Sequence, residues 1–297
     1  MSLTLQEFLQ QATAELRHHS PTARLDGEVL AMHVCGLTRA QLITRADDIL
    51  SPSQLQTLQD LLARRSTGEP VAYLTGEREF WSMPLRVTRA TLIPRPDTEI
   101  LVEQALARIP QEATWRIADL GTGSGAIALA IAQERPHCHL IATDLSATAL
   151  AIAQDNAHRL GINNIEFRLG SWAAPLQNER LEMIVSNPPY VRRDDPHLHQ
   201  GDVRYEPFNA LIGGDDGLQA IREITGLVAP LLKPSGWLLL EHGHDQAGET
   251  MMILLKNGFS GCLCYKDLTQ YDRITVGQWS GDNPSIHLPV RPLPWQM

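Results

Sequence analysis

The segment Trp115–Ala132 reads WRIADLGTGSGAIALAIA, and the order of residue types in it decides the fold class. An apolar strand that ends at Leu120 runs into a glycine-rich turn, and an alanine-rich helix follows from Ala126. Glycines let the backbone approach a ligand closely, and the first turn of the helix presents free NH groups. This unit predicts a ligand site at the carboxyl edge of a parallel sheet.

Strands and helices alternate from Asp97 onward. Apolar strands are predicted near residues 115–120, 138–143, 164–169, 182–187 and 236–241. The alternation predicts an α/β domain, Rossmann-like, with a mostly parallel sheet and helices on both faces. Phe259–Tyr265 and Arg273–Trp279 are strand-like with no obvious helix between them. We expect them to pair as antiparallel closing strands and to complete a seven-stranded sheet.

The rest of the chain divides by its patterning. Residues 1–75 carry apolar side chains at helical spacing and predict a small bundle that recognises a partner, with a purely structural role as the alternative. Residues 76–95 alternate apolar and polar and predict a β-hairpin linker. The α/β domain then spans residues 96–280. Residues 281–297 hold four prolines and no periodicity, which predicts a flexible tail.

A second informative stretch, Asn187-Pro188-Pro189-Tyr190, follows the apolar strand at residues 182–187. Prolines fix φ and remove backbone donors, so Pro188 offers a carbonyl without the accompanying NH. Asn187 adds a side-chain carbonyl, and Tyr190 adds a flat ring with a polar tip. Two such acceptors suit the hydrogens of a planar NH2 group and leave its nitrogen facing an electrophile. A proline-rich turn is the plain alternative.

The nature of the electrophile follows from the glycine turn. Gly121-x-Gly123-x-x-Ala126 satisfies the relaxed dinucleotide fingerprint, so an NAD-dependent dehydrogenase competes. S-adenosylmethionine (SAM) is favoured because Asp119, two residues before the glycines, can reach its amino-acid end through water or backbone amides. The segment Asn187–Tyr190, called the mouth below, also lies at the carboxyl edge of the predicted parallel sheet, where ligands of open α/β sheets bind. Asp144, at the end of the next strand, is expected to accept from ribose hydroxyls.

Asp119–Gly125 and Asn187–Tyr190 together resemble the paired motifs of class I SAM-dependent methyltransferases that act on planar nitrogens. More narrowly, the chain resembles the release-factor glutamine methyltransferases (the PrmC/HemK family). The segments that carry this resemblance are Gly68–Gly76, Glu79–Trp81, Leu92–Glu99 and Gln200–Pro207. This resemblance extends from the N-terminus to about Trp279. The resemblance implies a protein-glutamine N5-methyltransferase acting on the Gly-Gly-Gln motif of bacterial class 1 peptide-chain release factors.

The resemblance also implies roles for the mouth. The Asn187 side-chain oxygen and the Pro188 carbonyl each accept one NH of the glutamine amide, while Tyr190 packs against the amide and Pro189 completes the binding surface. This arrangement favours positive charge that develops on nitrogen in the transition state. No catalytic His or Glu is expected, because the methylated nitrogen is acidic and loses its proton after the transfer.

The cofactor contacts are implied in the same way. The methionine part of SAM is expected against Gly121, Thr122, Gly123, Ser124 and Gly125. Trp172 is expected to cover the adenine. Ser171 stands where the family often has Asp, so it would hold the adenine amino group more weakly or through water. Arg95 and Glu99 are expected to line the cofactor or substrate entrance, with an ion pair that anchors the hairpin as the alternative.

Composition restricts the possible functions. The formal net charge is -9 and the sequence pI is about 5.6, which argues against a protein that grips nucleic acid through its phosphates. No apolar run approaches a membrane span, and the N-terminus lacks a signal-peptide pattern. The cysteines form no CxxC pair, as expected for a cytoplasmic protein. The pairs His197/His199 and His242/His244 lack accompanying ligands, so no metal site is expected.

Three other functions remain open. A nucleic-acid adenine N6 methyltransferase uses a similar mouth on a flipped base, but the acidic charge balance and the missing Lys/Arg-rich segment disfavour it. A SAM-binding regulatory module without turnover is disfavoured by the intact mouth. A dinucleotide enzyme comes last. A monomer that works without direct nucleic-acid contact is the expected state.

Overall fold

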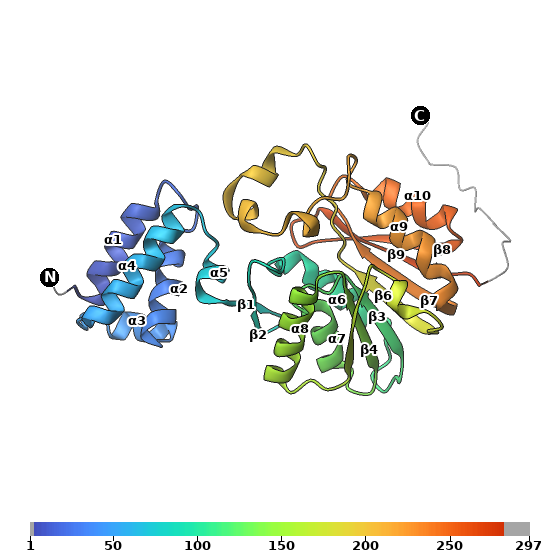
Figure 1. The fold of residues 1–297 in the computed structure, drawn as a ribbon, viewed down its shortest axis with the longest axis horizontal. Helices are drawn as coiled ribbons and strands as arrows, with labels where there is room; N and C mark the ends of the chain where they lie inside the picture. Colours follow the sequence, from blue (N-terminus) through green and yellow to red (C-terminus); the bar gives the residue numbers. More distant parts are fainter. Residues whose placement is uncertain (1–2, 282–297) are drawn as a thin grey trace, which may run out of the picture.

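The computed structural model describes residues 3–281 (Figure 1). Its N-terminal part is a helical bundle made of α1 (Leu5–Leu16), α2 (Ala23–Cys35), α3 (Arg39–Thr44), α4 (Pro52–Ser66) and α5 (Val71–Thr75). These helices pack around their own apolar core, which includes Phe8, Leu30 and Leu58. The side chain of Ser51 accepts from the backbone NH of Gln54 and caps α4, and Pro52 occupies the first turn.

A β-hairpin follows the bundle, as predicted. Its strands β1 (Glu77–Phe80) and β2 (Met83–Arg86) pair antiparallel. The turn residues Trp81 and Ser82 have φ values of 52° and 58°. The indole Nε1 of Trp81 donates to Glu134 at 2.9 Å, and the backbone NH of Arg86 donates to the Asn156 side chain at 2.7 Å. The hairpin is therefore tied to the helices that cover the sheet.

The described residues form a seven-stranded sheet in the order β5-β4-β3-β6-β7-β9-β8. Its strands are β3 (Arg116–Leu120), β4 (His139–Asp144), β5 (Ile165–Leu169), β6 (Leu181–Ser186), β7 (Leu232–Glu241), β8 (Phe259–Lys266) and β9 (Asp272–Trp279). The pairs among β3 to β7 are parallel, whereas β9 runs antiparallel to both β7 and β8. The predicted sheet and its closing pair are confirmed.

Helices cover both faces of the sheet. They are α6 (Glu99–Leu106), α7 (Ala126–Glu134), α8 (Ala147–Leu160), α9 (Gln219–Val228) and α10 (Ala247–Lys256). Neighbouring residues of a strand point to opposite faces, so Ile117 packs with α6 and α7 whereas Ala118 packs with α9 and α10. Both cores are almost fully buried, and together they fix the edge at which the parallel strands end.

The segment between β6 and α9 arches toward the helical bundle (Figure 1). It contains the short helices η3 (Pro196–His199), η4 (Gly201–Tyr205) and η5 (Phe208–Ala210). The buried guanidinium of Arg65 on α4 joins the two parts, since it donates to Asp26 at 2.7 Å and to Asp202 at 2.7 Å. The arch therefore connects the bundle to the edge of the sheet that follows β6.

Two sequence expectations concern the remainder of the chain. The predicted tail, residues 281–297, lies outside the described residues except for Gly281. Within residues 3–281, none of the helices combines the length and the apolar character that crossing a membrane requires.

Candidate active site

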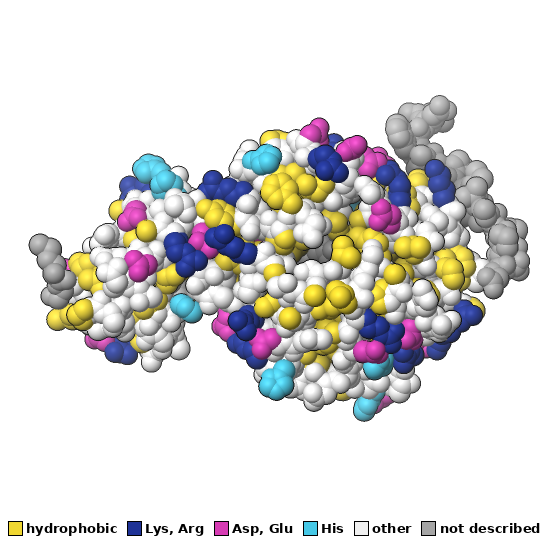
Figure 2. All heavy atoms as spheres, in the orientation of Figure 1, with side chains coloured by type: hydrophobic (Ala, Val, Ile, Leu, Met, Phe, Trp, Pro, Cys, Tyr) yellow, Lys and Arg dark blue, Asp and Glu magenta, His cyan; other side chains and the backbone are white. Residues whose placement is uncertain are grey.

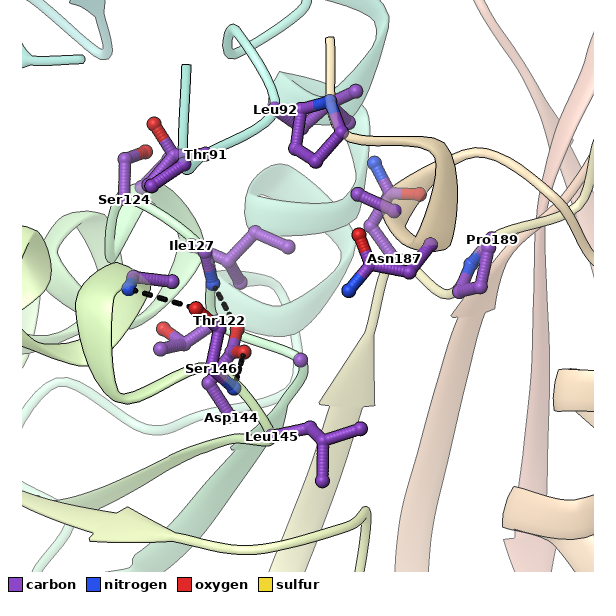
Figure 3. Close-up of a pocket in the computed structure, with 18 of the residues that line it drawn as sticks. Thr91, Leu92, Thr122, Ser124, Ile127, Asp144, Leu145, Ser146, Asn187 and Pro189 are labelled. Carbon is purple, nitrogen blue, oxygen red and sulfur yellow. Dashed lines mark hydrogen bonds between the residues drawn. The ribbon is translucent and has the colours of Figure 1, made fainter. Parts of the chain in front are cut away.

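A cavity of about 470 Å³ lies at the carboxyl edge of the parallel strands. Its walls come from the segment before α6, from the glycine turn with the end of β4, and from the mouth after β6 (Figure 3). The predicted site residues that line it are Arg95, Gly121, Thr122, Gly123, Ser124, Asp144, Ser171, Trp172, Asn187 and Pro189. The predicted residues outside its wall are Glu99, Asp119, Gly125, Pro188 and Tyr190.

The glycine turn needs its glycines for two different reasons. Gly121, Gly123 and Gly125 have φ values of 72°, 57° and 87°, in the left-handed region that side chains rarely adopt. A Cβ on Gly125 would also lie 2.9 Å from Leu129 and 3.2 Å from Ala153. Gly125 therefore seats α7 against α8, while the other two glycines let the backbone line the cavity.

Asp144 connects the turn to the end of β4. One carboxylate oxygen accepts from the Gly123 NH at 2.9 Å, and the other accepts from the Ser146 NH at 2.8 Å (Figure 3). Each carboxylate oxygen can accept a further hydrogen bond. Asp144 therefore holds the turn in place and keeps acceptor capacity for a ligand in the cavity.

Asp119 lies beneath the turn, where only 1% of its surface is exposed. Its Oδ2 accepts from the Thr122 hydroxyl at 2.7 Å, whereas Oδ1 has no hydrogen-bond partner among the described residues. Burial raises the pKa of Asp119 to about 7, and the nearby charge of Asp144 acts in the same direction. Asp119 is thus a buried acid with an unused acceptor directly under the cavity floor.

Trp172 covers the far side of the turn. Its backbone has a φ of 44°, and a Cβ on Gly121 would lie 3.3 Å from its ring. The indole Nε1 donates to the Glu223 carboxylate at 3.1 Å. Glu223 on α9 lines the cavity and was not predicted, because an exposed glutamate 51 residues away carries no signal in the sequence.

The mouth begins where β6 ends. The hydroxyl of Ser186 donates to the Leu120 carbonyl at 2.7 Å and fixes the strand end. The side chain of Asn187 points into the cavity (Figure 3), and its Nδ2 donates to the Thr98 hydroxyl at 3.1 Å. Because the amide nitrogen is held by the protein, the Oδ1 atom of Asn187 is left as an acceptor for a ligand.

Tyr190 lies behind this mouth. Its hydroxyl donates to Oε1 of Glu241, the last residue of β7, at 3.2 Å. Burial raises the pKa of Tyr190 well above its ordinary value, with the Glu241 charge as the next cause. The hydroxyl therefore binds the protein interior, and the packing of this ring against a substrate stays a prediction.

Comparisons with known proteins agree with this geometry. The sequence matches the PrmC N-terminal domain over residues 7–76 and the methyltransferase small domain over residues 96–201. The release factor glutamine methyltransferase of Yersinia pestis is 48% identical over 94% of this chain and 100% of its own length. That of Xylella fastidiosa (strain 9a5c) is 49% identical over 87% of this chain and 94% of its own.

The chain belongs to the release factor glutamine methyltransferase family. A solved methyltransferase from Pyrococcus furiosus shares the fold, with a TM-score of 0.51 at 16% identity over 74% of this chain and 98% of its own. The class I fold, the enzyme class and SAM as the cofactor, all predicted from the sequence, are confirmed.

The cavity residues fit the cofactor of this family. Asp144 has free acceptor capacity for ribose hydroxyls, and Trp172 offers a flat ring for adenine. The unpartnered oxygen of Asp119 beneath the turn suits a cationic group above it. When bound, SAM supplies a methyl group on a positively charged sulfur. Its individual contacts with these residues remain predictions.

Arg95 and Glu99 have different partners in the structure. Arg95 lines the cavity and forms an ion pair with Glu206, which also accepts from the Ile93 NH at 3.2 Å. Glu99 accepts from the Trp81 NH at 3.0 Å, so it anchors the hairpin. The ion pair given as the alternative is not formed between Arg95 and Glu99, because each has a different partner. An anchoring role for Glu99 is nevertheless favoured over a place at the entrance.

Proposed function

We propose that this enzyme transfers the methyl group of SAM to the side-chain amide nitrogen of the glutamine in the Gly-Gly-Gln motif of class 1 peptide-chain release factors. One observation carries the proposal. The Asn187 amide nitrogen is hydrogen-bonded to Thr98, so the oxygen of this cavity-lining side chain is left as an acceptor. A planar amide that donates to this oxygen turns its nitrogen toward the methyl group.

The proposed chemistry needs alignment more than a strong base. The nitrogen lone pair of an amide is delocalised into its carbonyl, so the amide is a weak nucleophile. Acceptors at Asn187 Oδ1 and the Pro188 carbonyl favour the positive charge that develops on nitrogen, and they do so most strongly in the transition state. The methylated nitrogen is acidic and releases its proton afterwards. The methyl transfer itself is an in-line displacement, whose rate depends on the distance and alignment between the amide nitrogen and the methyl group.

The choice of substrate rests on the relatives, which are named for release factors. We assign recognition of the release factor to the helical bundle of residues 1–75, which has its own core and contacts the arch through Arg65 and Asp202. The enzyme is proposed to act as a monomer in the cytoplasm, without direct nucleic-acid contact. The tail, residues 281–297, has no assigned part.

The test is a competition between substrate classes. The pure enzyme is incubated with SAM and either an unmethylated release factor or single-stranded oligonucleotides that contain adenine. Intact-mass measurement should show the gain of one methyl group on the release factor and none on the oligonucleotides. A release factor with Gln→Ala in the motif is the control and should gain no methyl group. Transfer to adenine alone would contradict the proposal and favour a nucleic-acid methyltransferase.

A further inference from the structure

The cavity has a second carboxylate in its wall besides that of Asp144. Among residues 3–281, the acidic side chains that line the cavity are Asp144 at the end of β4 and Glu223 on α9. Asp144 holds the glycine turn through two backbone NH groups. Glu223 is exposed and contacts neither the turn nor the mouth through a hydrogen bond of its own. Its place in the cavity wall therefore needs an explanation.

Two neutral donors orient the Glu223 carboxylate. Its Oε2 accepts from the Trp172 indole Nε1 at 3.1 Å, and its Oε1 accepts from the side-chain amide of Gln219 at 2.9 Å. Gln219 lies one helical turn earlier on α9. Each carboxylate oxygen can accept a second hydrogen bond. Because neither donor is charged, the carboxylate keeps its negative charge as well as this acceptor capacity.

Trp172 determines where this carboxylate lies in the cavity. The backbone carbonyl of Trp172 accepts from the Thr143 hydroxyl at 3.0 Å, and a Cβ on Gly121 would lie 3.3 Å from the indole ring. The ring is therefore held beside the glycine turn. The indole NH points outward from the edge of the ring, so its acceptor Glu223 lies at that edge. A flat base that packs against the ring brings its own edge near Glu223.

We infer that Glu223 recognises the adenine of SAM by accepting a hydrogen bond from its amino group. A carboxylate only accepts, so it favours a base that carries an amino group and disfavours one that carries a carbonyl in the same place. Ser171 also lines the cavity, but its hydroxyl both donates and accepts and so suits either base. The charged acceptor also forms the stronger hydrogen bond. The inference places adenine against Trp172, and it is independent of the methyl acceptor.

The test compares how tightly two ligands bind to the full chain. S-adenosylhomocysteine, the product left when SAM gives up its methyl group, carries the amino group of adenine. S-inosylhomocysteine carries a ring carbonyl at that position. Calorimetry should find that the wild type binds the adenosyl compound about 10-fold more tightly, at the lower end for a hydrogen bond to a charged group because Glu223 is exposed. The ratio of the two dissociation constants is the decisive quantity, since damage to the cavity weakens both ligands.

The decisive variant is Glu223→Gln, which should reduce this ratio to about threefold or less. An amide can turn its NH2 toward a carbonyl, so the affinity for the inosyl compound should stay or rise. Ser171→Ala should keep the wild-type ratio, because the inference gives the amino group to Glu223. Glu249 is an exposed glutamate on α10 outside the cavity wall, and Glu249→Gln is the matched control that should also keep the ratio.

The outcomes separate recognition of the base from a structural role. If Glu223 only held Trp172 in place, Glu223→Gln would weaken both ligands equally, and the unchanged ratio would overturn the inference. A ratio that is lost in Ser171→Ala but kept in Glu223→Gln would also overturn it and assign the amino group to Ser171. A wild type that binds both ligands equally would do the same. The assay contains no release factor, so failure of the proposed function would leave these results unchanged.

Discussion

Two buried carboxylates, Asp119 at the glycine turn and Glu241 behind the mouth, differ mainly in their charged neighbours. Each is 1% exposed, accepts from one hydroxyl, and has an oxygen left over in the described part of the chain. Burial raises the pKa of each to about 7. The charge of Asp144 raises the pKa of Asp119 further, whereas the charge of Arg273 opposes the rise for Glu241.

The difference indicates what each side of the cavity is built for. The charge of Arg273, which forms ion pairs with Asp97 and Asp267, opposes the rise in the pKa of Glu241. The acidic pair on the other side gains stability when a cation arrives, and SAM carries two positive groups. We therefore propose that the turn side is the part of the cavity that binds SAM, and that the mouth side binds the substrate amide. On the face that Figure 2 shows, several Lys and Arg side chains lie where the helical bundle meets the rest of the molecule, with acidic side chains among them.

The largest expected effect is on the mouth side. Asn187→Asp replaces a neutral acceptor with a charge and breaks the donation to Thr98. We expect kcat to fall by about 100-fold or more, as when a transition-state hydrogen bond is removed, with the SAM affinity within a few-fold of the wild type. The exposed residue Asn163 provides the control Asn163→Asp. Near-normal turnover in Asn187→Asp would remove Asn187 from the mechanism.

The turn side should show the opposite pattern. Asp144→Ala removes a carboxylate that holds two backbone NH groups and faces the cavity. Hydrogen bonds to charged groups contribute enough to weaken SAM binding by about 10- to 100-fold when lost. At saturating SAM, kcat should be nearly unchanged. Calorimetry and steady-state kinetics check both, with Asp155→Ala on α8, outside the cavity wall, as the control. A lower kcat with normal SAM affinity would contradict the division between the two sides.

Stability provides a smaller effect. Gly125→Ala places a side chain at a φ of 87° and 2.9 Å from Leu129, whereas Gly161→Ala meets no atom within 4 Å at a φ of 69°. Both bear the cost of a left-handed backbone, about 1 kcal/mol, and Gly125→Ala adds overpacking of about 1–3 kcal/mol. Denaturant unfolding should therefore find Gly125→Ala less stable. Equal stabilities would show that the turn tolerates a side chain without cost.

The smallest expected effect tests the two carboxylates directly. Because the pKa values of Asp119 and Glu241 are raised by folding, their contribution to stability is fully present below the unfolded pKa and is lost as the pH rises through 7. Between pH 5 and 8, the melting temperatures of Asp119→Asn and Glu241→Gln should rise relative to that of the wild type. At saturating SAM, the rise of the melting temperature relative to the wild type should become smaller for Asp119→Asn but not for Glu241→Gln. An equal response of both variants to SAM would contradict the comparison.

The sequence predicts those parts of the site that are contiguous in the chain. The glycines, Asp144 and the Asn187–Tyr190 mouth are fixed by local spacing after strands, so their positions follow from the pattern. The direction of a side chain does not follow from the pattern. The Tyr190 hydroxyl, for example, donates a hydrogen bond to the buried Glu241. The mostly parallel seven-stranded sheet with its antiparallel closing pair also follows from the alternation of elements, whereas the order of the strands comes from the structure.

Partners that meet only through the fold are missed. Thr98 reaches Asn187 across 89 positions, and Arg95 finds Glu206 across 111. No periodicity or motif connects such pairs. The alternative considered for Arg95 and Glu99 paired two residues close in sequence, whereas in the fold each has a more distant partner.

The most direct test of the account is to locate the transferred methyl group within the release factor. After reaction with SAM, the Gly-Gly-Gln peptide is isolated and fragmented in a mass spectrometer. The account predicts one methyl group on the side-chain amide nitrogen of this glutamine with the wild type, and none with Asn187→Ala that still binds SAM. A methyl group on another residue, or one that persists in Asn187→Ala, would contradict the assignment of the mouth.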